Sequence, residues 1–323
     1  MPPPLVIYTR RPYPWVVRVA RDLAAATIFR RHRNAGPAAV AASLRRGLKA
    51  LGVPFRWNPA APPRGATVAV LSDPEALRRA IGWKRAGRIA RLLAGPNLAV
   101  TPGDHDGLIA APEIDLYVVP ARWTLDYYVA GAPTLAGRIA IWPAGVDAEA
   151  FRPPAGPRPR RALVYRKDLA GQENASDVLV GEVEAVLAAD GWDVARIAYG
   201  DHTRDDFRRR LGEASLLVFL SPTESQGIAL HEAWAMDVPT LVWDQGVTVL
   251  GGERIKTSSA PTLTPRTGAF FTGADELRER LAAMEAGTLH FDPRGWTEEH
   301  GTDAKAAEAF LALATDQRRP PVA

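Results

Sequence analysis

Two glutamates separated by seven residues, Glu224 and Glu232, lie in the otherwise apolar segment SPTESQGIALHEAWAMDVPTLVWD (221–244). On one helix, eight residues would place the second carboxylate about 12 Å along the axis and roughly 80° around it, which excludes a shared proton or a shared metal ion. Carboxylates accept strong hydrogen bonds from hydroxyls, so the pair could hold two ends of an elongated polyol ligand. The alternative is that Glu224 complements a helix dipole and that Glu232 is solvated.

The surroundings of the two glutamates indicate a strand, a loop and a helix in that order. LLVFL (216–220) reads as a buried strand, and Ser225 is the expected N-cap of the helix that follows. The backbone amides of Gln226, Gly227 and Ile228 are then expected to face outward as hydrogen-bond donors at the carboxyl end of the sheet. Gly227 also removes a side chain where a ligand approaches.

The elements that must position these residues follow from alternating short apolar runs and longer helix-period segments. Strands are expected at 5–9, 67–72, 97–101, 114–120 and 139–143, and then at 162–166, 193–199, 216–220 and 239–243. Helices are expected at 37–51, 75–94, 176–190, 204–214, 226–236, 273–287 and 302–317. Alternation of this kind is typical of βα units around a mainly parallel sheet, and it predicts an α/β fold.

One segment breaks the pattern and divides the chain. FRPPAGPRPRR (151–161) is rich in proline, glycine and arginine and cannot build a core, so it is interpreted as a linker. The prediction is two Rossmann-like domains, 1–150 and 162–300, with a cleft between them. A last helix within 301–323 is expected to pack back on the first domain.

Composition limits the chemistry and the partners. The 323 residues include no cysteine, which excludes disulfides and thiolate catalysis, and the net charge of +4 permits an anionic partner. The N-terminus lacks the features of a signal peptide and no apolar run approaches ~18 residues, so a cytoplasmic location is expected. The segments 16–33 and 37–52 are apolar on one side and basic on the other. They predict either core helices or a basic patch for peripheral contact with an anionic membrane.

Several further segments agree with one known family in their order and spacing. They are IDLYVVPARWTLDYY (114–128), IWPAGVDAEAFRPP (141–154), ALVYRKD (162–168) and TGAFFTGADELRERL (267–281). Together with the E-x7-E spacing of Glu224 and Glu232, they resemble the retaining glycosyltransferases of the GT-B fold, family 4 in particular. The resemblance spans roughly residues 95–285 of the 323.

The resemblance implies roles for residues of the second domain. Glu232 would hold the ribose of a nucleotide-diphosphate sugar, and Glu224 would face the donor sugar with Ser225, Gln226, Gly227 and Ile228. Arg166 and Lys167 would neutralise the diphosphate, although the family generally spaces its arginine and lysine further apart. Tyr199 would contact the base; the alternative is that it only ends its strand. Asp237 departs from the small residue that the family usually has after the signature helix.

In the first domain the resemblance points to two further candidates. Gly36 stands at a helix start, where the family has a glycine-rich loop near the diphosphate, although the usual double glycine is missing and a plain turn is the alternative. His105, within PGDHDG (102–107), is the candidate for a residue near the reacting centre, with a solvated loop histidine as the alternative.

The function expected from the resemblance is transfer of a sugar, with retention of anomeric configuration, from a nucleotide-diphosphate donor to a glycan, lipid-linked or small-molecule acceptor. No metal and no cofactor besides the donor is expected. One alternative is a nucleotide-sugar epimerase, which is built on similar paired domains. The other is a non-catalytic protein that binds nucleotides or sugars, because the loop 244–266 departs from the family. Nucleic-acid binding is disfavoured, since the arginines are dispersed and no basic run is interleaved with aromatic residues.

Overall fold

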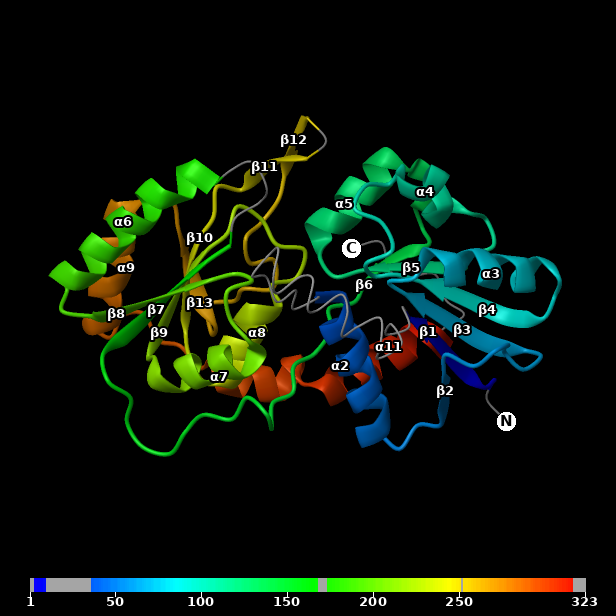
Figure 1. Cartoon of the computed structure of the whole chain (residues 1–323), viewed down its shortest axis with the longest axis horizontal. Coiled ribbons are helices and arrows are strands. Elements are labelled where there is room, and N and C mark those ends of the chain that lie inside the picture. Colours follow the sequence, from blue (N-terminus) through cyan, green and yellow to red (C-terminus); the bar gives the residue numbers. More distant parts are fainter. Residues whose placement is uncertain (1–2, 10–35, 168–172, 251, 316–323) are drawn as a thin grey trace, which may run out of the picture. The chain divides into compact units, whose positions relative to one another are not determined.

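The computed structural model describes residues 3–9, 36–167, 173–250 and 252–315, and only the backbone of residues 173–177 (Figure 1). These residues form two compact units. Unit 1 contains the described residues up to Gly145 together with the segment that begins at Asp303, and unit 2 runs from Val146 to Thr302. Each unit is a parallel sheet with helices on its faces.

Unit 1 is built on a six-stranded sheet in the order β2-β1-β3-β4-β5-β6, with every neighbouring pair parallel. The strands are β1 (Leu5–Thr9), β2 (Phe55–Trp57), β3 (Ala66–Leu71), β4 (Ile89–Ala94), β5 (Leu116–Val119) and β6 (Ile139–Ile141). The helices are α2 (Gly36–Ala50), α3 (Pro74–Arg85), α4 (Asp104–Gly107), α5 (Arg122–Gly131) and α11 (Asp303–Thr315), with short 3-10 turns η1 (Leu108–Ala110) and η2 (Pro133–Leu135).

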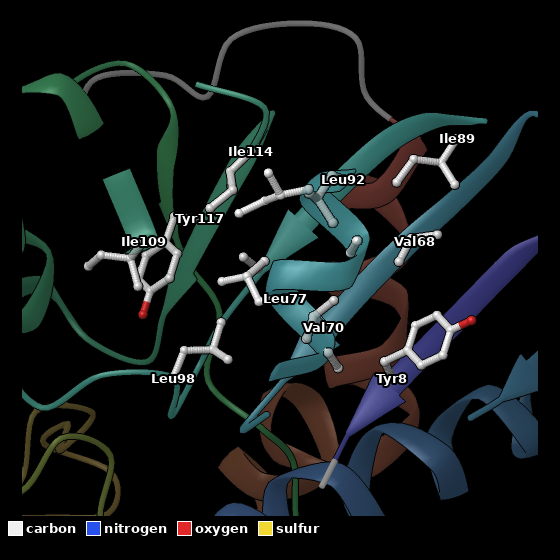
Figure 2. Close-up of a cluster of buried hydrophobic side chains, with 14 of the residues drawn as sticks. Tyr8, Val68, Val70, Leu77, Ile89, Leu92, Leu98, Ile109, Ile114 and Tyr117 are labelled. Carbon is white, nitrogen blue, oxygen red and sulfur yellow. The ribbon is translucent and has the colours of Figure 1, made fainter. Parts of the chain in front are cut away.

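The core of unit 1 lies on both faces of this sheet. On one face Leu77 of α3 packs among Val68, Val70 and Leu92, and Ile109 and Tyr117 extend the cluster (Figure 2). On the other face α2 and α11 cross so closely that a Cβ at Gly47 would lie 2.0 Å from the carbonyl oxygen of Asp303. The C-terminal helix is therefore part of the unit that the N-terminal strand begins.

Unit 2 has a five-stranded parallel sheet in the order β13-β10-β9-β7-β8 and a separate antiparallel hairpin of β11 and β12. The strands are β7 (Arg161–Arg166), β8 (Asp193–Ala198), β9 (Leu216–Leu220), β10 (Thr240–Trp243), β11 (Val247–Leu250), β12 (Glu253–Lys256) and β13 (Gly268–Phe271). The helices are α6 (Glu173–Ala189), α7 (Arg204–Glu213), α8 (Ile228–Ala235), α9 (Ala274–Glu285) and α10 (Pro293–Trp296), followed by the π-helical turn η3 (Thr297–Gly301).

The two faces of the unit 2 sheet are covered by different helices (Figure 1). Alternate strand residues such as Val164 and Val218 pack with α6 and α9, whereas Tyr165 and Phe219 pack with α7 and α8. Alternation follows from the pleat of a strand, which sends successive side chains to opposite faces. Because both faces are covered, the strands are apolar throughout, as is typical of parallel sheets.

The predicted α/β class with two Rossmann-like domains is confirmed, and one region of the sequence was assigned wrongly. The helix predicted at 75–94 ends at Arg85, because Gly87 turns the chain at a φ of +64° into strand β4. In β4 the consecutive residues Leu92, Leu93 and Ala94 are all buried, so IARLLA carries no two-residue alternation and its apolar residues fitted a helical period. The strand predicted at 97–101 is a loop, which begins with Asn97 at a φ of +65°.

The two basic amphipathic segments have different outcomes. Residues 16–33 lie outside the described residues. In α2, Val40, Leu44 and Leu48 are buried in unit 1, so the apolar side of this helix is not available to a membrane. Of the described helices, none has the length and apolar character that spanning a membrane requires.

Candidate functional site

Unit 2 has a topological switch point between β7 and β9. From β7 the chain continues to β8 on one side, while β9 pairs on the other, so the connections diverge at the carboxyl ends of β7 and β9. Ligands of open α/β sheets bind in the crevice outside such a point. The amide of Lys167, one residue past β7, donates to the carbonyl of Leu220 at 2.8 Å and joins the ends of both strands.

Lys167 and Glu224 form an ion pair at this point. The ammonium nitrogen of Lys167 lies 2.7 Å from Oε1 and 2.8 Å from Oε2 of Glu224. The carboxylate is buried, with a side chain 8% exposed, whereas the Lys167 side chain is 24% exposed. The ammonium also lies 5.0 Å from the ring centroid of Tyr199, which is itself half exposed. The pair thus consists of a partly exposed cation and a buried carboxylate.

Hydrogen bonds from two loops fix the position of Glu224. Its amide donates to the carbonyl of Ser258 at 2.9 Å, and Oε1 accepts from the hydroxyl of Ser221 at 3.3 Å. Ser258 is in turn held by its hydroxyl, which donates to Asp244 at 2.8 Å, and Ser259 donates to the carbonyl of Ser221 at 2.5 Å. The divergent loop 244–266 therefore supports Glu224 directly through Ser258.

The start of α8 differs from the sequence expectation. The N-cap is Gly227, not Ser225, and α8 begins at Ile228. Gly227 has a φ of +81°, and an added Cβ would lie 2.8 Å from a methyl carbon of Leu230, so glycine is required there. Glu224 consequently lies in the loop before the helix, and the helical spacing of the two glutamates does not apply. Ser225 is exposed, whereas Gln226 is buried.

Glu232 lies on α8 and forms a second ion pair. Its Oε1 accepts from Nε of Arg204 at 2.8 Å, and its side chain is only 7% exposed. The Arg204 guanidinium lies 4.9 Å from the ring centroid of Phe151. Each glutamate of the E-x7-E spacing is therefore a buried carboxylate paired with a partly exposed cation.

Tyr165 of β7 is a buried tyrosine whose hydroxyl is influenced by the charges of both glutamates. Its ring stacks on Phe219 at 5.1 Å and meets the edge of Phe207 at 5.4 Å. Burial raises the pKa of the Tyr165 hydroxyl well above its usual value, and the negative charges of Glu224 and Glu232 raise it further. Helix α8, which carries Glu232, packs on the same face of the sheet as Tyr165. The hydroxyl is neutral at physiological pH.

Arg166 does not follow Lys167 toward Glu224. It is the last residue of β7 and pairs with Ala198 and Leu220 in the ladder, so its side chain alternates to the side opposite Tyr165. Its carbonyl accepts from the amide of Tyr199 at 2.8 Å, which places Tyr199 directly after β8. The structure therefore groups Lys167, Tyr199 and Glu224, and it places Arg166 on the other face of the strand.

The two candidates of unit 1 lie on different helices, Gly36 on α2 and His105 on α4. Gly36 is the first residue of α2, and a Cβ there would meet nothing within 4 Å, so packing does not require glycine. His105 is exposed and has a φ of +56°. Its neighbour Asp104 accepts hydrogen bonds from the hydroxyl of Thr101 and from two amides, and the first of these is the main cause of its lowered pKa.

Three kinds of residue at the site were missed by sequence reasoning. Tyr165 was assigned only to a strand, Arg204 only to a helix, and Ser221, Asp244 and Ser258 to loops. Arg204 carried a signal, because a cation in the first turn of a helix opposes the helix dipole. The loop serines carried none, since their partners are up to 38 residues away in sequence. Among the described residues, no group of three or more His, Asp and Glu could hold a metal ion.

Comparison with known proteins shows the fold. No family model matches the chain, and no curated protein does. Among solved structures, the apo lipopolysaccharide outer core galactosyltransferase WaaB has a TM-score of 0.57 at 11% identity, over 95% of this chain and 98% of that chain. A glycosyltransferase from Rickettsia africae has a TM-score of 0.56 at 10% identity, over 97% of this chain and 98% of its own.

A third neighbour was solved with ligands. A variant of TarM from S. aureus, in complex with Fondaparinux, alpha-GlcNAc-glycerol and UDP, has a TM-score of 0.52 at 13% identity, and the match covers 86% of this chain and 59% of TarM. The chain has the GT-B fold. Its two Rossmann-like domains are units 1 and 2, and the ion pairs of Lys167 with Glu224 and of Arg204 with Glu232 lie within the second.

His231, which precedes Glu232 on α8, is predicted to make the stability of unit 2 depend on pH. Burial lowers the pKa of His231 to about 4, and Nε2 lies 2.8 Å from the hydroxyl of Thr262. In the unfolded state the histidine becomes protonated near pH 6.5, whereas in the folded state it becomes protonated only near pH 4. Stability should therefore be full above pH 7 and fall as the pH is lowered from 6.5 to 4, by about 3 kcal/mol.

Urea unfolding at several pH values measures this loss. His231→Phe, which keeps an aromatic ring 4.9 Å from Trp234, should remove most of the slope between pH 6.5 and 4. The exposed His290 is the matched control, and His290→Phe should leave the slope unchanged. An equal slope in wild type and His231→Phe would show that this histidine does not titrate as expected.

Proposed function

We propose that the protein is a glycosyltransferase that binds a nucleotide-diphosphate sugar at the carboxyl edge of the unit 2 sheet and transfers the sugar, with retention, to an acceptor. The observation that carries the proposal is the Lys167–Glu224 pair at the switch point between β7 and β9. In a GT-B fold this places a cation and a carboxylate where a dinucleotide-sized ligand is expected.

In the proposed complex each group has a distinct partner. Lys167 contacts the diphosphate. Its contact with the Tyr199 ring restricts the conformations of the lysine side chain. Glu224 accepts hydrogen bonds from the hydroxyls of the sugar, near the amides of Gln226, Gly227 and Ile228. Glu232 accepts from the ribose. Tyr199, half exposed after β8, offers one ring face to the base.

The proposed chemistry is stabilisation of the leaving group. The bond between the sugar C1 and the diphosphate oxygen breaks, and negative charge develops on the diphosphate beside the Lys167 ammonium. Preorganised charges of this kind stabilise a transition state without reorganisation. The acceptor oxygen bonds to C1 on the face that the diphosphate leaves, which retains the configuration, and the acceptor proton goes to a phosphate oxygen. The acceptor is proposed to be a glycan, a lipid-linked sugar or a small hydroxylated molecule.

A thermal-shift panel tests the donor site. UDP, GDP, ADP and dTDP and their sugars are compared on wild type, Glu232→Ala and the control Glu279→Ala, which alters an exposed acid of α9. A ligand at 100 times its dissociation constant should stabilise the wild type by about 2.7 kcal/mol. We expect one base to give this shift, Glu279→Ala to retain it and Glu232→Ala to lose it.

The reaction is tested next with the donor that the panel finds. Proton NMR follows the anomeric configuration of the sugar that is released to water or to an acceptor mixture. Appearance of the α-anomer first from an α-linked donor supports retention, and the β-anomer contradicts it. Conversion to an epimeric nucleotide sugar would favour the epimerase, and binding without any turnover would favour the non-catalytic protein. No response to any nucleotide would remove the transferase proposal.

A further inference from the structure

The hairpin of β11 and β12 is separate from the five-stranded sheet of unit 2 and is anchored beside the end of β10 (Figure 1). Asp244, the residue after β10, binds both ends of the hairpin. Its Oδ1 accepts from the amide of Gly246 at 2.8 Å, and its Oδ2 accepts from the hydroxyl of Ser258 at 2.8 Å. The amide of Thr257 donates to the carbonyl of Gly246 at 3.0 Å. A two-stranded hairpin is marginally stable alone, so these bonds help to hold it in place.

The two faces of the hairpin have different surroundings. Residues that pair across two strands project to the same face of the ribbon. The inner face is formed by two of the pairs, Thr248 with Ile255 and Leu250 with Glu253. The outer face is formed by the other two pairs, Val247 with Lys256 and Val249 with Arg254. Thr248 is buried and Ile255 is half-buried, whereas every residue of the outer face is exposed.

The outer face combines apolar and positively charged side chains. Val247 is 39% exposed and Val249 is 50% exposed, and they lie side by side on one face of one strand. Single exposed apolar residues are ordinary on a protein surface, so an adjacent pair is more informative. Within the described residues, neither Arg254 nor Lys256 has an acidic partner, and the acid of the hairpin, Glu253, lies on the inner face. The outer face therefore carries two uncompensated positive charges.

This combination fits an anionic lipid surface. Lipid phosphates attract cations, and apolar side chains beside those cations can enter the headgroup region. Four side chains are too few for a stable protein interface, which buries about 800 Å² on each partner. A surface for single-stranded nucleic acid uses aromatic rings on which bases stack, and valine offers none.

We infer that the outer face of the β11–β12 hairpin is a docking surface for an anionic membrane. Arg254 and Lys256 bind the lipid phosphates, and Val247 and Val249 insert among the headgroups. This inference goes beyond the proposed function, because docking needs no nucleotide and is measured without one.

Docking at the hairpin would bring the lipid surface near the proposed donor site. The hairpin follows β10, which runs parallel to β9, so it leaves the edge of the sheet that carries Lys167 and Glu224. Ser258, two residues past β12, accepts a hydrogen bond from the amide of Glu224 at 2.9 Å. Among the proposed acceptors, the lipid-linked class is therefore the one that docking favours, and this consequence alone rests on the proposed function.

Flotation with lipid vesicles measures the docking. Vesicles of phosphatidylcholine, with and without about one third phosphatidylglycerol, are mixed with wild type and variants. The wild type should bind the anionic vesicles at least about tenfold more tightly than the neutral ones. Arg254→Gln with Lys256→Gln should weaken this binding about 25-fold, because each cation near the surface contributes about fivefold. Val247→Thr with Val249→Thr keeps the β-branched shape and should weaken it about fivefold.

The matched control removes the same number of charges from another helix. Arg45→Gln with Lys49→Gln changes two exposed cations of α2 and should leave vesicle binding within about twofold of wild type. Loss of binding in this control and not in the hairpin variant would move the contact to α2 and overturn the inference. If the wild type bound a single-stranded oligonucleotide and no vesicle, the partner would be a nucleic acid, which also overturns the inference.

A local probe separates insertion of the hairpin from a folding defect in the variants. The chain contains no cysteine, so Val249→Cys can carry an environment-sensitive fluorophore at that position alone. Val178→Cys is the control, because Val178 of α6 is a valine of the same unit that is 66% exposed. Anionic vesicles should shift the emission to shorter wavelength at position 249 and not at position 178. No shift at position 249, or an equal shift at both positions, would overturn the inference.

Discussion

Replacing Lys167 with methionine is expected to weaken the binding of a nucleoside diphosphate by about 100-fold, while the affinity for the corresponding nucleoside stays within about threefold. The Lys167 ammonium is the described cation that contacts Glu224 at the switch point, and its side chain is 24% exposed to an incoming ligand. Methionine keeps the length of the side chain and loses the charge. The Glu224 carboxylate, 8% exposed, would then face the diphosphate without its cation and repel it.

Isothermal titration of the nucleoside and its diphosphate measures this effect. Lys256→Met is the matched control, because Lys256 is an exposed lysine on β12 of the same unit. The double variant Lys167→Met with Glu224→Gln should recover part of the lost affinity, since it removes the repelling carboxylate together with the cation. Unchanged diphosphate affinity in Lys167→Met would exclude a phosphate contact for this lysine.

Replacing Trp234 with alanine is expected to lower the free energy of unfolding by about 3–5 kcal/mol, the range for truncating a large buried aromatic residue. Trp234 is fully buried on α8, and its ring lies 4.9 Å from His231 and 5.2 Å from Trp296. Its indole N–H donates to the hydroxyl of Thr240 at 3.1 Å. This residue holds the helix that carries Glu232 against the end of the sheet where β10 begins, so its loss should weaken nucleotide binding too.

Urea unfolding followed by circular dichroism measures the loss. Trp234→Phe keeps most of the apolar volume and removes the N–H, so it should destabilise by only about 1–2 kcal/mol. The difference between the two variants separates packing from the hydrogen bond to Thr240. If Trp234→Ala lowered the free energy of unfolding by less than about 1 kcal/mol, the neighbouring rings would have repacked to fill the cavity.

The sequence by itself determined the fold class and one half of the candidate site. Apolar runs such as LLVFL predict buried parallel strands regardless of their partners, because burial on both faces requires apolar side chains at every position. Glu224 and Glu232 were identified by their spacing and by the segments around them. Lys167 was named together with Arg166 through the family resemblance of the segment ALVYRKD (162–168). These features involve residues that are close in the sequence, so they can be recognised from one sequence alone.

Only the tertiary structure decided which residues complete the site and how they face. Arg204 reaches Glu232 from 28 positions away, and Ser258 reaches Glu224 from 34, so no periodicity records either contact. The start of α8 moved from Ser225 to Gly227 because the backbone turns left-handed at Gly227, with a φ of +81°, a conformation that glycine adopts readily. Sequence patterns record the burial of a residue, whereas the partner of a buried charge is set by which elements the sheet brings together.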